Sequence, residues 1–141
     1  SALLKSLGIA DWVYAPGQVS REQAHAALLS AHQAVIVSES AQSASEWPGG
    51  KIYDCLRCGA WILATGTAGS AKDRLLAECG ERPIIELADV NAIKERIVAD
   101  FRAWERGEWK PRLPVPALRA YEASALATRY VAILNRVAAQ R

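Results

Sequence analysis

The most constraining feature of this sequence is the pattern of residues 34–64. Residues 34–37 (Ala-Val-Ile-Val) form a short apolar run, residues 50–58 follow a helical pattern that ends at Gly59, and residues 61–64 (Trp-Ile-Leu-Ala) form a second apolar run. Short apolar runs on either side of a helix predict a strand–helix–strand unit. Its two strands are expected to lie parallel in one sheet, because the helix carries the chain back across it.

The same alternation continues on both sides of this unit. Ser20 and Gln23 have the spacing of a capping box, and Ile93, Ile97 and Phe101 recur every four residues, as on one face of a helix. We therefore predict an α/β fold with a Rossmann-like parallel sheet flanked by helices. The further elements expected are helices at 2–7, 20–31, 70–79 and 89–104, and strands at 12–15 and 83–87.

A chain of 141 residues that is 51% hydrophobic supports one good core and is too short for two ordinary domains. We assign residues 1–104 to a Rossmann-like domain that is incomplete at its N-terminus. Residues 105–116 contain Gly107 and three prolines and are expected to be a linker. Residues 117–141 are expected to form a long C-terminal helix, which packs back on the domain or on a missing N-terminal domain. The chain contains no Met, so we expect Ser1 to be a fragment boundary.

Charge and cysteine content exclude several classes. The net charge of +2 is too small to indicate a nucleic-acid partner. No apolar run approaches the roughly 18 to 20 residues of a membrane span, and no signal peptide opens the chain. Three cysteines, an odd number, fit a reducing compartment. We expect a cytoplasmic protein, free or peripheral at the inner face of the membrane, and the sequence leaves its oligomeric state open.

A candidate anion site lies at the start of the helix predicted for residues 50–58. Gly49 and Gly50 stand where unpaired N–H groups and the positive end of the helix dipole attract phosphate. Ligands of parallel sheets bind beyond the carboxyl ends of the strands, where this turn is expected. Glu46 and Asp54 bracket it and are acceptors for sugar hydroxyls. The arrangement suits a phosphorylated sugar, although Pro48-Gly49-Gly50 is also compatible with a simple turn.

Residues 48–66 resemble a segment of the family 4 glycosyltransferases of the GT-B fold. The family segment reads Pro-Gly-Lys, a hydrophobic residue, then Tyr-Asp-Tyr-Leu, a glycine and a second apolar run. Weaker likeness extends to residues 7–20, 31–38, 89–93 and 121–124 and so covers most of the chain. The resemblance implies the later part of a donor-binding domain. The acceptor domain, the first strands of the donor domain and the Arg/Lys pair that usually neutralises the diphosphate are missing.

The resemblance also implies roles for individual residues. Glu46 and Asp54 match the family's Glu-x7-Glu motif, with Glu46 toward the donor sugar and Asp54 toward the ribose hydroxyls. Asp54 departs from the motif, because its side chain is one methylene shorter than glutamate. The backbone of residues 49–51 would hold the diphosphate, with the Lys51 ammonium as a charge partner. The implied donor-site residues are Ser38, Glu39, Glu46, Gly49, Gly50, Lys51 and Asp54, and no metal ligand is among them.

The function implied by this resemblance is retaining, metal-independent transfer of a sugar from a nucleoside diphosphate to a glycan or lipid-linked acceptor, as in polysaccharide biosynthesis. The nucleotide sugar would be a substrate, and no cofactor is expected. This chain alone is expected to be inactive, because catalysis needs both halves of the cleft. The alternatives are a non-catalytic nucleotide-sugar-binding or interaction module, and a GT-B-like sugar epimerase.

The order of the sheet gives one structural expectation. In the common order 3-2-1-4-5-6, the strand at 12–15 would be the third strand and would pair with a missing one. An unpaired strand edge is a liability. Either upstream sequence exists in the natural protein, or this strand has moved beside the strand at 34–37.

Several other side chains invite a functional interpretation. Cys55 and Cys58 have a redox or zinc spacing, but they lie inside a predicted helix without a partner pair, so we interpret them as buried structural thiols. His25 and His32 are not spaced for one helical face and are expected to face solvent or cap helices, without an acid–base partner.

Two further pairs remain open between a functional and a structural role. Lys72 and Arg74 follow a loop expected at a strand's carboxyl end, so they contact the donor or lie on a solvated helix face. Trp104 and Trp109 pack the linker, or mark a surface that meets another domain or a membrane.

Overall fold

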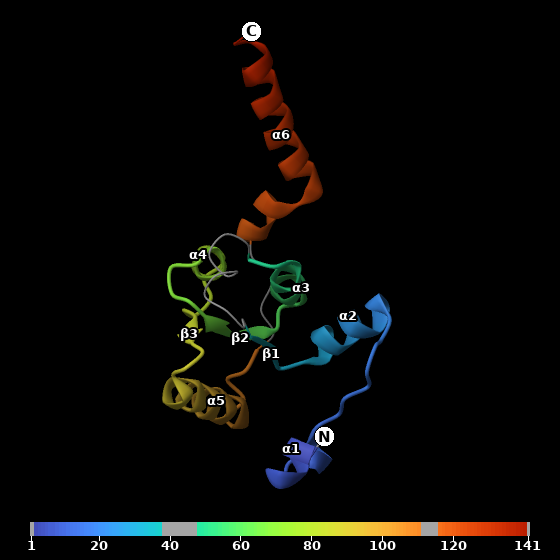
Figure 1. Ribbon diagram of the computed structural model, residues 1–141, viewed down its shortest axis with the longest axis vertical. Helices are drawn as coiled ribbons and strands as arrows, with labels where there is room; N and C mark the ends of the chain where they lie inside the picture. Colours follow the sequence, from blue (N-terminus) through green and yellow to red (C-terminus); the bar gives the residue numbers. More distant parts are fainter. Residues whose placement is uncertain (1, 38–47, 111–115, 141) are drawn as a thin grey trace.

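The computed structural model describes residues 2–37, 48–110 and 116–140, which form an α/β fold around a three-stranded parallel sheet (Figure 1). The strands are β1 (Gln33–Ile36), β2 (Trp61–Gly66) and β3 (Ile85–Glu86), and their order in the sheet is their order in the chain. Gln33 pairs with Trp61, and Thr65 pairs with Ile85. The predicted fold class is confirmed.

Helices cover both faces of this sheet. Figure 1 shows α3 (Gly50–Cys58) and α4 (Ala71–Glu78) on one face and α5 (Val90–Glu105) on the other. Successive strands that are also neighbours place their crossover helices on the same face, since each crossover has the same hand. The sheet is therefore the middle layer of three, with its carboxyl edge at the loops that lead into α3 and α4.

The core lies where the central strand meets α3 and α4. Within β2, Ile62, Leu63 and Ala64 are all buried, as expected for a parallel strand covered on both faces. The C-terminal part of the chain adds one residue, Leu118, to this cluster. Its members are Ala34, Ile52, Cys55, Leu56, Ala60, Ile62, Ala64, Leu75, Leu76, Cys79 and Leu118.

Local signals in the sequence set the ends of two helices. Helix α2 (Arg21–Ser30) begins with the predicted capping box, in which the Ser20 hydroxyl accepts from the Gln23 N–H and the Gln23 side chain accepts from the Ser20 N–H. Helix α3 ends at Gly59, whose φ of 72° is a left-handed conformation that glycine adopts at low cost.

The strand predicted at residues 12–15 is wrong. Helix α1 (Ala2–Ser6) is followed by a short 3-10 helix, η1 (Ala10–Trp12), and Trp12 and Tyr14 are 88% and 89% exposed. Aromatic and β-branched residues favour a strand only where a neighbouring strand and a core cover them, and the part of the chain that the structure describes supplies neither. Residues 12–15 have not moved beside β1, so that alternative is excluded. β1 is an edge strand of the described sheet.

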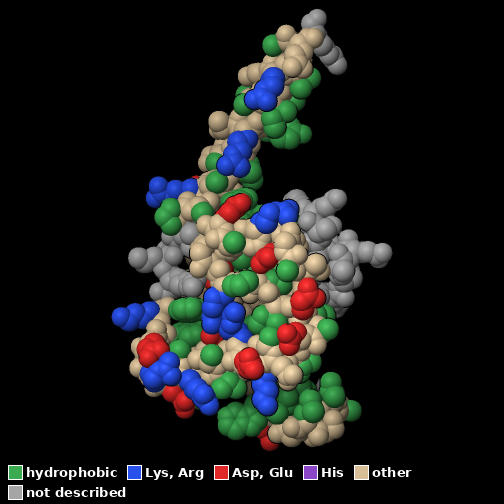
Figure 2. All heavy atoms as spheres, turned by 90° about the vertical axis from the view of Figure 1, so that its left-hand side faces the viewer, with side chains coloured by type: hydrophobic (Ala, Val, Ile, Leu, Met, Phe, Trp, Pro, Cys, Tyr) green, Lys and Arg blue, Asp and Glu red, His purple; other side chains and the backbone are tan. Residues whose placement is uncertain are grey.

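The C-terminal helix begins later than predicted. Residues Pro116–Tyr121 form a 3-10 helix, η2, and α6 spans Ala123–Ala138 after an extended Glu122. Leu118 and Tyr121 of η2 pack on the core, whereas α6 projects away from the sheet (Figures 1 and 2). The apolar residues of α6 that are 47–68% exposed are Leu126, Tyr130, Val131, Ile133, Leu134 and Val137. Helix α6 therefore does not pack back on the sheet, and packing on a further domain stays a prediction.

Among residues 2–37, 48–110 and 116–140, no helix is both long enough and apolar enough to cross a membrane.

Candidate functional site

The predicted anion site lies at the start of α3. Gly49 occupies the N-cap position with φ of 79°, and as a glycine it makes no side-chain capping hydrogen bond to the helix. A side chain at Gly49 is disfavoured by that backbone conformation, and a Cβ there would meet no atom of the described residues within 4 Å. The same open space surrounds Gly50. Among the described residues, nothing crowds the Cα positions of these two glycines at the start of α3.

The predicted site residues fall into two groups. Ser38, Glu39 and Glu46 lie outside the described residues. Gly49, Gly50, Lys51 and Asp54 all lie at the N-cap or in the first turns of α3. Lys51 and Asp54 are three residues apart in the helix, so their side chains share a face, and both line one pocket.

This pocket, which we call the α2–α3 pocket, has a volume of about 510 Å³. That volume lies in the range of about 300–1,000 Å³ that is typical of ligand pockets. Charged and polar groups come from α2 and α3, and apolar side chains come from α2 and β1. The lining residues are Arg21, Ala24, His25, Leu28, Ala34, Val35, Ile36, Val37, Lys51, Asp54 and Cys55.

A pair of titratable side chains joins the two helices of this pocket. His25 Nε2 lies 3.6 Å from Asp54 Oδ1, and the two side chains are 40% and 43% exposed. Such a half-exposed pair contributes little to stability. The expectation that His25 lacks an acid–base partner is therefore wrong. The partner, Asp54, belongs to another helix. The packing of α2 on α3 cannot be inferred from the spacing of residues in the sequence.

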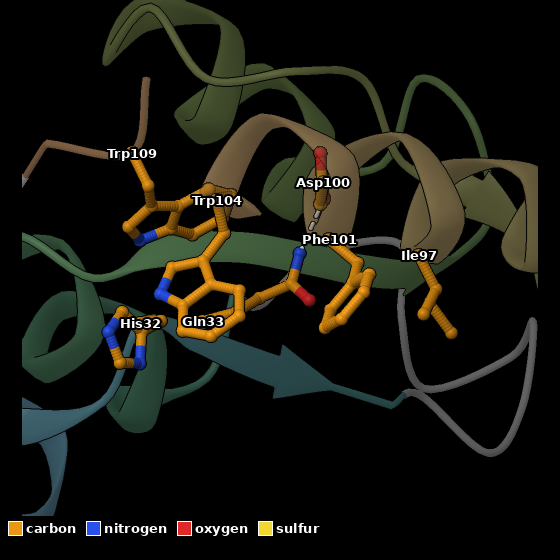
Figure 3. Close-up of a pocket in the computed structure, with 7 residues that line it drawn as sticks. All are labelled: His32, Gln33, Ile97, Asp100, Phe101, Trp104 and Trp109. Carbon is orange, nitrogen blue, oxygen red and sulfur yellow. Dashed lines mark hydrogen bonds between the residues drawn. The ribbon is translucent and has the colours of Figure 1, made fainter. Parts of the chain in front are cut away.

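A second pocket lies beneath α5, near the amino end of β1, and we call it the aromatic pocket (Figure 3). Its volume is about 310 Å³. Trp104 makes an edge contact with His32, with ring centroids 5.7 Å apart, and lies 5.5 Å from Phe101. Ile97 and Phe101, the predicted apolar face of α5, are 47% and 55% exposed and line this pocket instead of the core.

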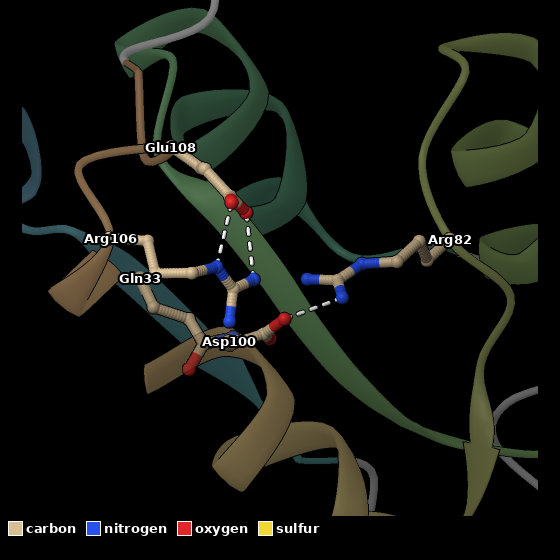
Figure 4. A network of polar contacts seen from close by, with 5 residues as sticks. All are labelled: Gln33, Arg82, Asp100, Arg106 and Glu108. Atoms are coloured by element: carbon tan, nitrogen blue, oxygen red, sulfur yellow. Dashed lines mark hydrogen bonds and ion pairs between the residues drawn. The ribbon is translucent and has the colours of Figure 1, made fainter. Parts of the chain in front are cut away.

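Asp100, which is 5% exposed, holds α5 against the sheet beside this pocket (Figure 4). Its Oδ2 accepts a hydrogen bond of 2.6 Å from Gln33 Nε2, and its Oδ1 accepts one of 2.5 Å from Arg82 Nη1. The Arg82 guanidinium also lies 5.2 Å from the centre of the Trp61 ring. These contacts tie α5 to β1 and to Arg82, which precedes β3.

The predicted linker packs on the same side. The ring centroids of Trp109 and Trp61 are 4.7 Å apart, and Trp61 Nε1 donates to the Lys110 carbonyl at 3.0 Å. The packing role expected for Trp109 is confirmed. Trp104 is 46% exposed and packs on His32 and Phe101.

The burial expected for Cys55 is confirmed, whereas that expected for Cys58 is not. Cys55 and Cys79 are buried and Cys58 is half-buried, and all three are free. Burial raises the pKa of the Cys55 and Cys79 thiols above the ordinary value, which disfavours the reactive thiolate. Across the described ranges, no three His, Cys, Asp or Glu side chains are grouped to hold a metal ion.

Lys72 and Arg74 differ in their surroundings. Lys72 is 7% exposed, and burial lowers the pKa of its ammonium. The interpretation of Lys72 as part of a solvated helix face is wrong, since the residue is buried. Arg74 is exposed and its Nη1 donates to the Gly69 carbonyl at 2.6 Å. A donor contact by either residue stays a prediction.

In comparisons with protein-family models, curated proteins and solved structures, this chain matches none of them. The chemistry of the α2–α3 pocket therefore has to be judged from its own groups. Unpaired helix N–H groups and ammonium or guanidinium groups bind phosphate, a carboxylate accepts from hydroxyls, and an apolar floor accommodates a planar ring.

Proposed function

We propose that this chain is the donor-binding part of a retaining glycosyltransferase, which transfers a sugar from a nucleoside diphosphate to a glycan or lipid-linked acceptor. The observation that carries the proposal is the start of α3. A helix N-terminus whose N-cap residue is Gly49, with φ of 79° and no capping side chain of its own, directly precedes Lys51 and Asp54 at the edge of a pocket of about 510 Å³. The resemblance of residues 48–66 to family 4 glycosyltransferases supports the same assignment.

Different groups at this edge of the pocket bind different parts of the donor. The N–H groups of residues 49–51 and the Lys51 ammonium bind the diphosphate, because both present positive charge to it. Asp54 accepts hydrogen bonds from the ribose hydroxyls. Glu46 is assigned to the donor sugar by its place in the Glu-x7-Glu motif alone. Transfer itself requires an acceptor domain, so this chain binds the donor without turning it over.

Calorimetric titration of the protein with UDP, GDP and ADP tests the proposal. We expect one of the three to bind, and Lys51→Ala and Asp54→Ala each to weaken that binding. Arg57→Ala is a matched control, because Arg57 is an exposed cation on the last turn of α3 that does not line the pocket. If the unsubstituted protein binds none of the three nucleotides, the proposal is wrong.

One observation favours a second candidate, a non-catalytic binding module that contacts a partner. The apolar residues of α6 are about half exposed, as they would be on a helix that meets another protein. Both candidates bind a nucleotide, so turnover distinguishes them. Hydrolysis of, or transfer from, a nucleotide sugar by a longer natural form of the chain would support the enzyme.

A further inference from the structure

The α2–α3 pocket contains cationic side chains that the glycosyltransferase resemblance does not assign to a donor site. Arg21 and His25 both come from α2, and both line the pocket together with Lys51 and Asp54 of α3. Arg21 and His25 are four residues apart in a helix, so they lie on the same face of α2. That face is directed toward α3, since His25 Nε2 lies 3.6 Å from Asp54 Oδ1.

The charge of this lining is complementary to a diphosphate. Arg21 and Lys51 carry fixed positive charges and Asp54 carries one negative charge, so the described lining has a net charge of +1, or +2 with His25 protonated. A nucleoside diphosphate brings two or three negative charges. Arginine suits this partner, because its planar guanidinium offers two parallel N–H donors to phosphate oxygens.

Contacts at both ends of helix α2 hold Arg21 and His25 at the α2–α3 pocket. Leu28, one turn beyond His25, packs against the core cluster, and the capping box of Ser20 and Gln23 fixes the start of the helix. Arg21 follows the cap directly and takes no part in its hydrogen bonds. Leu28 and Ile36 also line the pocket and pack against the core cluster, and they offer an apolar surface to the base of a nucleotide.

We propose that α2 supplies the positive side of the diphosphate site, with Arg21 as a phosphate-binding residue and His25 as a positioning residue that orients Asp54 toward the ribose. This inference rests on the proposed donor-binding function. It identifies cationic side chains within this chain that can neutralise the diphosphate.

The test compares a nucleoside diphosphate with the corresponding nucleoside by calorimetry at low and at high salt. Arg21→Gln should weaken diphosphate binding roughly tenfold, as expected for loss of one charge-assisted contact, and should flatten its salt dependence. Binding of the nucleoside, which has no phosphate, should stay unchanged. Arg57→Gln is the control for loss of a cation outside the pocket.

His25 requires a separate readout, because a packing role would also weaken binding. His25→Gln, Asp54→Asn and the double variant form a cycle, and we expect the two single losses to be non-additive if His25 acts through Asp54. Far-ultraviolet circular dichroism confirms that α2 remains folded in each variant. Additive losses would exclude the positioning role of His25.

The outcomes separate this inference from the proposed function. If the unsubstituted protein binds none of UDP, GDP and ADP, both are wrong. If it binds one of them and Lys51→Ala weakens that binding, the donor site stands. In that case, the inference about α2 is wrong if Arg21→Gln and Arg57→Gln bind the diphosphate with the same affinity and the same salt dependence.

Discussion

At the scale of single residues, Asp100 is the side chain on which the attachment of α5 most depends. Its carboxylate is buried and accepts hydrogen bonds from both Gln33 and Arg82. Asp100→Ala leaves the partly buried Arg82 charge and the Gln33 amide without this acceptor. We expect the free energy of unfolding to fall by about 3 kcal/mol, the lower end of the cost of breaking a buried pair. Urea denaturation followed by tryptophan fluorescence measures this change.

The exposed ion pair next to this network is the control. Arg106 donates two hydrogen bonds to Glu108, at 2.6 and 2.7 Å, but more than half of each side chain is exposed. Glu108→Gln should therefore change the free energy of unfolding far less than Asp100→Ala does. Equal losses for the two variants would show that burial of Asp100 is not the source of its contribution.

The residues that could be predicted from the sequence are those whose role depends on near neighbours. The Ser20–Gln23 capping box and the end of a helix at Gly59 follow from local backbone chemistry, and both were predicted. The contact of His25 with Asp54 and the burial of Lys72 depend on how separate helices pack. No local pattern encodes that packing, so these features were missed.

At the scale of elements, burial decides which helices the fold depends on. Leu76 of α4 is 0% exposed in the core, whereas Leu134 of α6 is 56% exposed. Leu76→Ala should lower the free energy of unfolding by about 2–5 kcal/mol through lost burial and a residual cavity. The same change at Leu134 should stay within about 0.5 kcal/mol, as for most surface substitutions.

Chemical denaturation of the two variants under identical conditions compares these effects. Because the substitution is the same in both, differences in side-chain chemistry cancel. A large loss for Leu134→Ala would mean that α6 packs on the rest of the chain in solution.

Helices and strands were predicted well where residues at their own ends mark where they begin and end. Helix α3 has the predicted bounds of 50–58 because Gly49 and Gly59 occupy the positions just before and just after it. Strand β2 starts at the predicted residue 61 and extends to Gly66. The residues at 12–15 have strand-like side chains but no partner strand in the described structure. The predicted helix from 117 starts later because Leu118 and Tyr121 turn inward to the core and Glu122 is extended.

At the scale of the whole molecule, the fold divides into a core and a projecting helix. Residues 33–121 contain the sheet and the residues of the core cluster, whereas α6 contributes no buried residue. Deletion of residues 123–141 should leave the midpoint of urea denaturation nearly unchanged. The far-ultraviolet circular dichroism should lose the signal of a helix of 16 residues.

One result of this deletion would contradict the prediction that the core is stable without α6. If the shortened chain no longer unfolds in one cooperative transition, α6 stabilises the core through contacts beyond those with η2. A protein shortened only from Ala139 onward is the matched control, because it keeps the whole of α6.

The contact between Gln33 and Asp100 has a consequence for the order of folding. The two residues lie 67 positions apart, so forming their hydrogen bond closes a longer segment of chain at a somewhat larger entropic cost. The parallel pairs β1–β2 and β2–β3 each close a shorter segment, because their strands are consecutive. We therefore expect the sheet to assemble with α3 and α4 first and α5 to dock last, so α5 should also be the first of these helices to exchange its amide hydrogens.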